Sequence, residues 1–346
     1  MKNKIYNILF LLIFIIIFSI FYSGEYINFH KEKQKIENEK IELDKKVWEF
    51  SFEKIDILKS TDIFYTPDIK VLDKIVSWII NAKNKVYIEV YMLTETRILD
   101  AIKKANGKDI DIKIVLEKNP YKATNINNKA YNFLVKNKIP VVWSNPDNYS
   151  LNHSKIILID EQAIISTWNF TYSSFKYNRE LFIFTQDKNI ISNLEKIFLN
   201  DYFFRKNIVY NNNLVLSPNY SREKIEYLIN NAKENINMYF PYIQDKNLEK
   251  LLIKKTKSWV KINLIVDKNI LENESYDNLI KSWIKIKKIP KNKLHAKAIL
   301  IDNKYLYIWS INFSSYSLDK NREVWILIKN KDIVWKFSEI FEEDFK

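Results

Sequence analysis

The feature of this sequence that most constrains its fold is an internal repeat. Residues 75–83 (IVSWIINAK) recur as residues 225–233 (IEYLINNAK), and residues 112–119 (IKIVLEKN) recur as residues 262–269 (INLIVDKN), both at a shift of 150. A third repeated block starts at His153 and again at His295, at a shift of 142. A period this long is typical of a duplicated domain, because solenoid repeats have roughly 20 to 45 residues. We therefore predict two similar halves, residues 55–205 and residues 206–346.

Each half has the same pattern of helices and strands, described here for the first half. Apolar residues at helical spacing predict helices over residues 71–82, 97–105 and 128–136. Runs rich in Val, Ile and Tyr predict strands over residues 85–92, 111–116 and 141–143. Two further apolar runs, residues 155–159 and 163–166, are separated by three polar residues, as in a hairpin. This alternation predicts an α/β fold made of two duplicated α/β sandwich halves.

The N-terminus has the composition of a membrane anchor. Lys2 and Lys4 precede an apolar stretch of 18 residues, 5–22, which contains two polar residues. As a helix this stretch would rise about 27 Å, close to a hydrocarbon core of roughly 30 Å. We therefore predict a signal anchor, a transmembrane helix over residues 1–23, in a single-pass membrane protein. Positive charge on the short N-terminal side predicts that the rest of the chain is extracytoplasmic.

Two other interpretations of this segment stay open. A cleaved signal peptide needs small residues before the cut, which residues 21–24 (FYSG) supply poorly. A buried core helix is disfavoured because the segment is terminal and apolar on every face. After the anchor, residues 24–54 are predicted to form a charged helical stalk, because residues 31–46 mix Lys and Glu with sparse Ile and Leu.

Two of the three histidines start the same short motif. Each is followed by Lys two residues later and by Asp seven residues later. The motif residues are His153, Lys155 and Asp160 in the first half and His295, Lys297 and Asp302 in the second. Because both copies fall at equivalent places of the repeat, chance does not explain them. The third histidine, His30, lies in the predicted stalk.

The two halves also agree after the motif. Residues 166–170 (STWNF) correspond to residues 309–313 (WSINF), and residues 178–180 (NRE) correspond to residues 321–323 (NRE). These segments supply further candidate polar residues: Thr167, Asn169 and Glu180 in the first half, and Ser310, Asn312 and Glu323 in the second.

The motif has the residue types of a phosphate site. A His and a Lys two residues apart on a strand project from the same face, which would make a poor core face. The alternative, a pair of buried structural histidines, explains the lysines badly. Ammonium and amide groups can hold the non-bridging oxygens of a phosphate while an imidazole reaches phosphorus or the leaving oxygen. One neutral and one protonated histidine would supply a nucleophile and a general acid.

This pattern resembles the phospholipase D superfamily, whose signature is H-x-K-x4-D-x6-G-S-x-N followed by an acidic residue. The resemblance covers residues 55–345 and implies a bilobal fold with one active site between the halves, a phosphohistidine intermediate, and neither a metal nor another cofactor. It implies that His153 is the nucleophile and His295 the general acid. By the same resemblance Glu180 and Glu323 orient the histidines, and Asp160 and Asp302 are structural. The implied phosphate ligands are Lys155, Lys297, Asn169, Asn312, Thr167 and Ser310.

The sequence departs from the signature at its glycine. Ser166 replaces it in the first copy and Trp309 in the second. A tryptophan here would narrow the pocket or alter the local backbone. The first copy also lacks one residue between Asp160 and Asn169, which would shift that amide.

Three functions fit the motif. The favoured one is a membrane-anchored enzyme that hydrolyses phospholipids or transfers their phosphatidyl group, because the anchor would hold the site near lipid. The alternative is a metal-independent nuclease, favoured by a net charge of +13. That charge also fits a compositional bias towards Lys, Asn and Ile. A binding protein without activity is disfavoured by the intact motifs. The expected partners are thus a phosphodiester substrate and a membrane; no protein partner is indicated. The absence of Cys excludes disulfides and thiolate chemistry.

Overall fold

The computed structural model describes residues 31, 33–35, 37–38, 41–42, 44–45, 49–242, 244–269, 274–289, 292–310 and 314–346. Residues 1–50 and residues 51–346 form two separate compact units. Those residues of 31–45 that are described are helical. No helix within the described ranges is both long and apolar enough to cross a bilayer. The predicted anchor, residues 1–23, lies outside the described residues.

The larger unit contains two seven-stranded sheets with the same topology. The first has the strand order β1-β8-β6-β5-β2-β3-β4, and the second has the order β9-β16-β15-β14-β10-β11-β12. In each sheet the three strands at one end are parallel and all other pairs are antiparallel. The duplication seen in the sequence is thus reproduced strand by strand, and the predicted α/β class with two sheets is confirmed.

The strands of the first half are short and mostly buried. They are β1 (Thr61–Tyr65), β2 (Lys85–Val90), β3 (Asp111–Leu116), β4 (Val141–Trp143), β5 (Lys155–Ile159), β6 (Gln162–Ser166), β7 (Asn178–Arg179) and β8 (Leu181–Thr185). Those of the second half are β9 (Leu214–Ser217), β10 (Asn235–Tyr239), β11 (Lys261–Val266), β12 (Lys285–Lys288), β13 (Lys293–Leu294), β14 (Ala298–Ile301), β15 (Tyr305–Ile308) and β16 (Glu323–Ile328). The predicted hairpin is confirmed, because β5 and β6 pair antiparallel.

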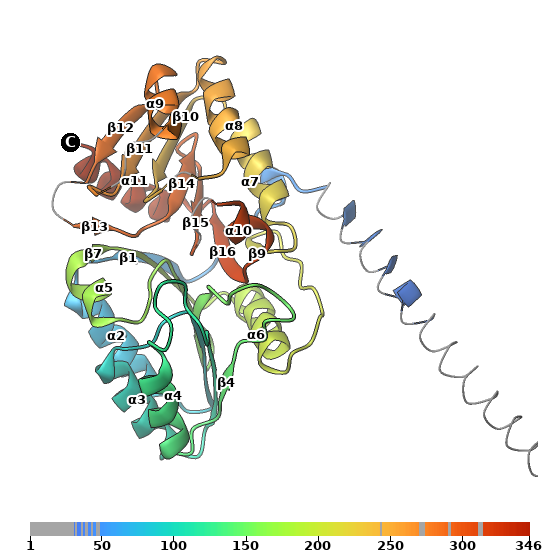
Figure 1. Ribbon diagram of the computed structural model, residues 1–346, viewed down its shortest axis with the longest axis vertical. Helices are drawn as coiled ribbons and strands as arrows, with labels where there is room; N and C mark the ends of the chain where they lie inside the picture. Colours follow the sequence, from blue (N-terminus) through green and yellow to red (C-terminus); the bar gives the residue numbers. More distant parts are fainter. Residues whose placement is uncertain are drawn as a thin grey trace, which may run out of the picture. The chain divides into compact units, whose positions relative to one another are not determined.

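Helices cover both faces of each sheet (Figure 1). The first half has α2 (Ile69–Ile80), α3 (Thr96–Asn106), α4 (Asn128–Lys136), α5 (Tyr172–Tyr177) and α6 (Lys188–Tyr202). The second has α7 (Ser221–Asn230), α8 (Lys246–Thr256), α9 (Glu274–Lys281), α10 (Ser315–Asp319) and α11 (Lys331–Phe345). In the lower half of Figure 1, α2, α3 and α4 lie on one side of the sheet and α6 lies on the other. Each sheet is therefore the middle layer of a sandwich.

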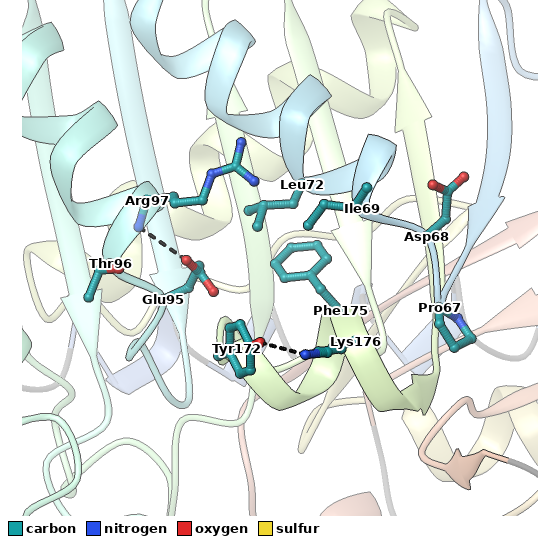
Figure 2. Close-up of a pocket in the computed structure, with 10 residues that line it drawn as sticks. All are labelled: Pro67, Asp68, Ile69, Leu72, Glu95, Thr96, Arg97, Tyr172, Phe175 and Lys176. Carbon is teal, nitrogen blue, oxygen red and sulfur yellow. Dashed lines mark hydrogen bonds between the residues drawn. The ribbon is translucent and has the colours of Figure 1, made fainter.

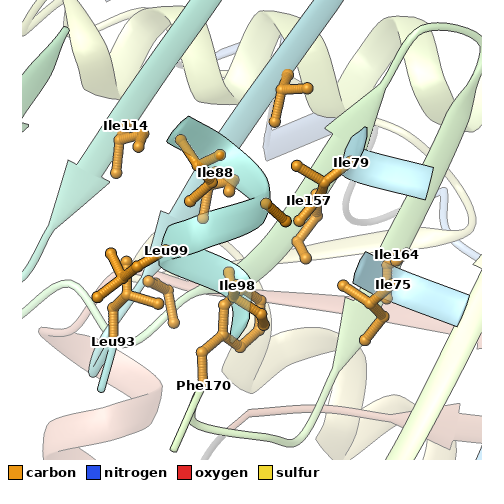
Figure 3. Packing of buried hydrophobic residues seen from close by; sticks show 14 of the residues in the cluster. Ile75, Ile79, Ile88, Leu93, Ile98, Leu99, Ile114, Ile157, Ile164 and Phe170 are labelled. Atoms are coloured by element: carbon orange, nitrogen blue, oxygen red, sulfur yellow. The ribbon is translucent and has the colours of Figure 1, made fainter. Parts of the chain in front are cut away.

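Local sequence explains where these helices begin and which face they bury. Asp68 caps α2 by accepting a hydrogen bond from the Lys70 N–H at 2.9 Å. The apolar residues of α2 and α3 recur at helical spacing and face the sheet, where Ile75, Ile79 and Ile98 meet strand residues such as Ile88 and Ile157 (Figure 3). All five of these side chains are buried, so this layer is a continuous apolar core.

The motif aspartates hold each sheet to a loop of the same half. The Asp160 carboxylate accepts hydrogen bonds from the backbone N–H groups of Lys83, Asn84 and Lys85 at 2.8–3.0 Å. Asp302 accepts the equivalent bonds from residues 233–235. Both aspartates have positive φ angles, 51° and 52°, at the turn between two strands. This geometry agrees with a structural role.

The first residues of the larger unit pack on the second half. Phe52 stacks on Tyr305 with ring centroids 4.0 Å apart, so the residues around it pack on the second half. The backbone of Asp56 and Leu58 is then hydrogen-bonded by the side-chain amides of Asn213 and Asn330. The chain therefore crosses the second half before it enters β1, because these two amides satisfy its backbone groups.

Candidate active site

The two histidine motifs meet where the halves join, and each histidine is held by a glutamate of the other half. The Nδ1 atom of His153 lies 2.9 Å from Glu323 Oε2. The Nδ1 atom of His295 lies 2.9 Å from Glu180 Oε2. Both carboxylates are fully buried. An acceptor at Nδ1 fixes the ring and leaves Nε2 as the nitrogen available for chemistry.

Short backbone pairings between the halves produce this exchange. Strand β13, which leads to His295, pairs in parallel with β7, which leads to Glu180. At the equivalent place Asn152 and Arg322 form a parallel bridge, and the His153 N–H donates to the Arg322 carbonyl at 2.8 Å. In Figure 1, β7 and β13 run between the upper and the lower half. The sequence predicted all four residues but not which glutamate serves which histidine.

Two buried lysines complete the centre. The side chain of Lys155 is 1% exposed and that of Lys297 is 0% exposed. Each Nζ donates to the carbonyl of the histidine in its own motif at 2.7 Å. Burying two ammonium groups close together is costly unless an anion compensates for them. The arrangement is therefore suited to an anionic group such as a phosphodiester.

The hydroxyl groups of Thr167 and Ser310 do not lie as the family resemblance implies for phosphate ligands. Thr167 Oγ1 donates to Glu180 Oε2 at 2.7 Å, and Ser310 Oγ donates to Glu323 Oε2. In the structure these hydroxyls fix the glutamates that hold the histidines. Asn169 is partly exposed, and no hydrogen-bond partner of its Oδ1 is found among the described residues. Asn312 lies outside the described residues.

The His153–Glu323 pair favours its uncharged form. Burial, together with the charges of Lys155 and Lys297, holds the pKa of His153 well below its ordinary value. Burial also raises the pKa of Glu323 to about 8, although Lys155 and the Ser310 hydroxyl oppose this shift. The imidazole of His153 is therefore a weak base in this environment.

The His295–Glu180 pair retains more charge. Burial lowers the pKa of His295, but the charge of Glu180 and its hydrogen bond oppose that shift. Burial alone would raise the pKa of Glu180, yet the charges of His295 and Lys297 and the hydrogen bonds outweigh it, so this pKa is below its ordinary value. Of the two histidines, His295 therefore holds a proton more readily.

A second exchange between the halves surrounds the first, and our sequence analysis missed it. Arg179 donates to both carboxylate oxygens of Asp344 at 2.7–2.8 Å. Arg322 donates to Asp201 at 2.7 Å. Each aspartate lies near the end of the last helix of the opposite half. The two aspartates are 143 residues apart, as are the two arginines, so this spacing was a usable signal.

The residues behind these aspartates differ between the halves. Tyr239 donates its hydroxyl to Asp344 at 2.7 Å. The equivalent place in the first half is occupied by Glu89, which lies within hydrogen-bonding reach of Asp201. Burial and the charge of Asp201 hold the pKa of Glu89 well above its ordinary value. We therefore assign the proton shared by these two carboxyl groups to Glu89.

Aromatic residues shape the surroundings of the motif. The ring of Tyr91 meets the His153 imidazole edge to face, with centroids 4.4 Å apart, and lies 5.3 Å from Lys155 Nζ. Trp309, which was expected to narrow the pocket or alter the local backbone, is 0% exposed and packs against Tyr307 and Trp325. It fills the core of the second half.

A cavity of about 590 Å³ is lined by residues at the starts of α2 and α3 and on α5 (Figure 2). Its lining combines apolar side chains with Arg97 and Lys176. The full lining is Pro67, Asp68, Ile69, Leu72, Glu95, Thr96, Arg97, Tyr172, Phe175 and Lys176. None of the motif residues lines it, but the backbone N–H of Glu95 donates to the carbonyl of Phe170, next to Asn169. The cavity therefore shares a wall with the segment that links Asn169 to Glu180.

Comparison with known proteins places this geometry in a family. A family model described as "Cardiolipin synthase, PLD-like domain" matches residues 75–202 and 225–345, one match for each half. The chain belongs to the phospholipase D-like family. The family predicted from the two motifs is thereby confirmed.

Relatives of this phospholipase D-like chain carry two kinds of name. It is 28% identical over 143 residues to a phospholipase D of Rickettsia prowazekii, covering 41% of this chain and 65% of the relative. It is 28% identical over 127 residues to a cardiolipin synthase of Listeria welshimeri, covering 35% of this chain and 25% of the relative. The phosphatidylserine synthase of Haemophilus influenzae has the same fold, with a TM-score of 0.67 and 12% identity over 87% of this chain and 89% of that one.

We predict that anion binding at this site weakens as the pH rises. Burial lowers the pKa of Lys155 to about 7 and that of Lys297 to about 8, so each ammonium is present below its pKa and lost above it. Loss of a proton from Glu323, whose pKa is about 8, acts in the same direction. The apparent Kd of sulfate, which does not titrate in this range, should rise by about tenfold per pH unit for each proton required.

Calorimetry from about pH 6 to about pH 9 would measure this dependence. The variant Lys155→Met should lose the step near pH 7 and retain the step near pH 8. An unchanged sulfate affinity over the whole range would contradict our description of the site.

Proposed function

We propose that this chain is a phosphodiesterase that acts on phospholipids through a phosphohistidine intermediate, either hydrolysing them or transferring their phosphatidyl group to an alcohol. The observation that carries the proposal is the reciprocal exchange between the halves, which gathers two oriented imidazoles around two buried ammonium groups. Such a centre supplies a nucleophile, an acid and charge compensation for a phosphodiester.

In the first step, Nε2 of His153 forms a bond to phosphorus and the bond from phosphorus to the leaving oxygen breaks. His295 gives its proton to that oxygen, so an alcohol leaves. In the second step, His295 takes a proton from water or from an acceptor alcohol, whose oxygen attacks phosphorus and releases His153. Lys155 and Lys297 compensate for the charge on the non-bridging oxygens throughout.

The electrostatic difference between the pairs supports this division of roles. A nucleophile must be unprotonated, and the lowered pKa of His153 favours that state. A general acid must hold a proton, and the charge of Glu180 favours protonation of His295. The chain supplies its own nucleophile and cationic groups, so the proposed reaction needs neither a metal nor another cofactor.

Two observations favour a phospholipid over a nucleic acid. The cavity at the starts of α2 and α3 has apolar walls formed by Ile69, Leu72 and Phe175, which suit an acyl chain better than a nucleotide. The relatives are named for lipid substrates or products. The net charge of +13 also fits nucleic acid, so a metal-independent nuclease is the second candidate.

The lipid proposal predicts turnover of phospholipid vesicles in the presence of EDTA. The purified full-length chain should release a headgroup alcohol from vesicles, or form a new phosphatidyl ester when glycerol is supplied, and leave single-stranded DNA intact. The variant Lys297→Met should lose this activity, because the phosphate loses a buried positive charge. Cleavage of DNA without cleavage of lipid would favour the nuclease. Loss of activity in EDTA with recovery on adding Mg²⁺ or Zn²⁺ would refute the mechanism.

We also propose that residues 1–23 hold the protein in a membrane with the catalytic body outside the cytoplasm. The support is the sequence alone: Lys2 and Lys4 precede an apolar stretch. Protease added from outside should degrade the body in cells whose outer layers have been opened but whose cytoplasmic membrane is intact. N-terminal sequencing should find residues 1–23 retained. Protection of the body, or a mature N-terminus near Gly24, would contradict this topology.

The sharpest test separates the two histidines. Both His153→Ala and His295→Ala should lose most turnover, because attack and leaving-group protonation belong to one step. A nitrophenyl phosphodiester needs little protonation, so His295→Ala should still form a phosphohistidine at His153. Acid-labile, base-stable phosphate should therefore be trapped on His295→Ala and not on His153→Ala.

The third histidine provides a matched control, because His30→Ala removes an imidazole from the predicted stalk and should leave turnover unchanged. The reverse trapping pattern would exchange the two roles. Full turnover in both variants would show that the motifs are not the catalytic machinery.

A further inference from the structure

Two tryptophans project almost completely from the second half. Trp259 is 91% exposed and Trp283 is 90% exposed. Each stands two residues before a strand, Trp259 before β11 and Trp283 before β12. Because β11 and β12 are adjacent and parallel, both strands begin at the same edge of the sheet. The two indole side chains therefore belong to one surface.

The backbone at both positions is unfavourable for tryptophan. The φ angles are 65° for Trp259 and 67° for Trp283, in the left-handed region that bulky residues seldom adopt. The N–H groups of both residues donate to a carbonyl three residues back, at 3.0 Å, in the turn that follows α8 or α9. Neither the turn nor the core requires an indole at these positions.

The first half serves as an internal control. The equivalent turns before β3 and β4 carry Asp109 and Lys138, with φ angles of 57° and 56°. The same fold is therefore completed with polar residues, of which aspartate tolerates this conformation better. Tryptophan at both turns of the second half is a feature of this edge and not of the fold.

The charge around the tryptophans also differs between the halves. Residues 250–261 contain five Lys and no Asp or Glu, and residues 278–289 contain four Lys and no Asp or Glu. The corresponding residues 100–111 of the first half contain three Lys and three Asp. Glu234 and Asp302 are acidic neighbours of this edge: the Glu234 carbonyl accepts from the Lys261 N–H, and the Asp302 carboxylate accepts from the N–H groups of residues 233–235. Exposed indoles in a field of lysines complement an anionic, partly apolar surface.

We propose that this edge, the two turns with Trp259 and Trp283 and their flanking lysines, docks on the surface of an anionic lipid bilayer. Indole rings partition to the boundary between headgroups and acyl chains, and lysines add attraction to anionic headgroups. Ile280, which is 49% exposed in the last turn of α9, adds apolar area beside Trp283. The contact is distinct from residues 1–23 and does not depend on catalysis.

The docking edge is separate from the candidate active site. Asp267 follows the other end of β11 and accepts from the Leu294 N–H, next to His295, at 2.7 Å. The tryptophans lie at the opposite end of that six-residue strand, about 20 Å away along it. Docking would therefore orient the body on the membrane without covering the two histidines.

The absence of cysteine allows a direct test on the full-length chain. Single cysteines at positions 259, 283, 109 and 138 would carry an environment-sensitive fluorophore, in vesicles of phosphatidylcholine with about one third phosphatidylglycerol. Spin-labelled lipids should quench the probes at 259 and 283 and leave those at 109 and 138 unquenched. The quenching should fall in pure phosphatidylcholine and in high salt.

In a second set of variants, the reference protein keeps both tryptophans and the test protein replaces them. With the fluorophore at position 258, the double exchange Trp259→Asp and Trp283→Lys, which installs the residues of the first half, should reduce quenching to the level seen at position 109. Circular dichroism would verify that this variant folds. Equal quenching at all four positions would overturn the proposal. A change in probe fluorescence that depends on protein concentration, or on added single-stranded DNA instead of vesicles, would also overturn it, because the edge would then bind a second copy or nucleic acid.

Discussion

The pairing of each histidine with a glutamate of the opposite half is the interaction on which the rest of the structure depends. Glu180 and Glu323 are fully buried carboxylates whose main compensation comes from across the junction. Separating the halves would remove from each glutamate the histidine and the lysine of the opposite half. The Arg179–Asp344 and Arg322–Asp201 pairs repeat the same principle one layer outwards. Catalytic geometry and cohesion of the two halves are therefore one property.

Much of this could be predicted from sequence, because the relevant signals are local or repeated. Helical spacing located α4 to the residue, and a run rich in Ile and Val located β3 to the residue. The His, Lys and Glu positions followed from two copies of one pattern. Strands β1 and β8 and helices α5 and α6 were not predicted, although Asp187, which caps α6, was a local start signal.

What the sequence did not reveal is mostly non-local. No local pattern indicates that His153 pairs with Glu323 rather than with Glu180, since this depends on the parallel bridge between Asn152 and Arg322. The family resemblance implied that the hydroxyls of Thr167 and Ser310 bind the phosphate. A sequence motif does not show which neighbour a hydroxyl contacts, and in the structure both hydroxyls donate to the glutamates. The sequence alone did not show that the ring of Trp309 packs in the core of the second half.

Glu89 and Tyr239 have a consequence for how such a scaffold can evolve. In a dimer of identical subunits, every substitution occurs twice and a two-fold axis forces both histidines to share one environment. A single chain that carries both copies escapes that restriction, because a carboxyl at position 89 and a phenol at position 239 can coexist around otherwise equivalent arginine–aspartate pairs. Gene fusion thereby allows the two halves to hold different numbers of protons at equivalent places. An enzyme that needs one base and one acid from two copies of the same residue gains directly from that freedom.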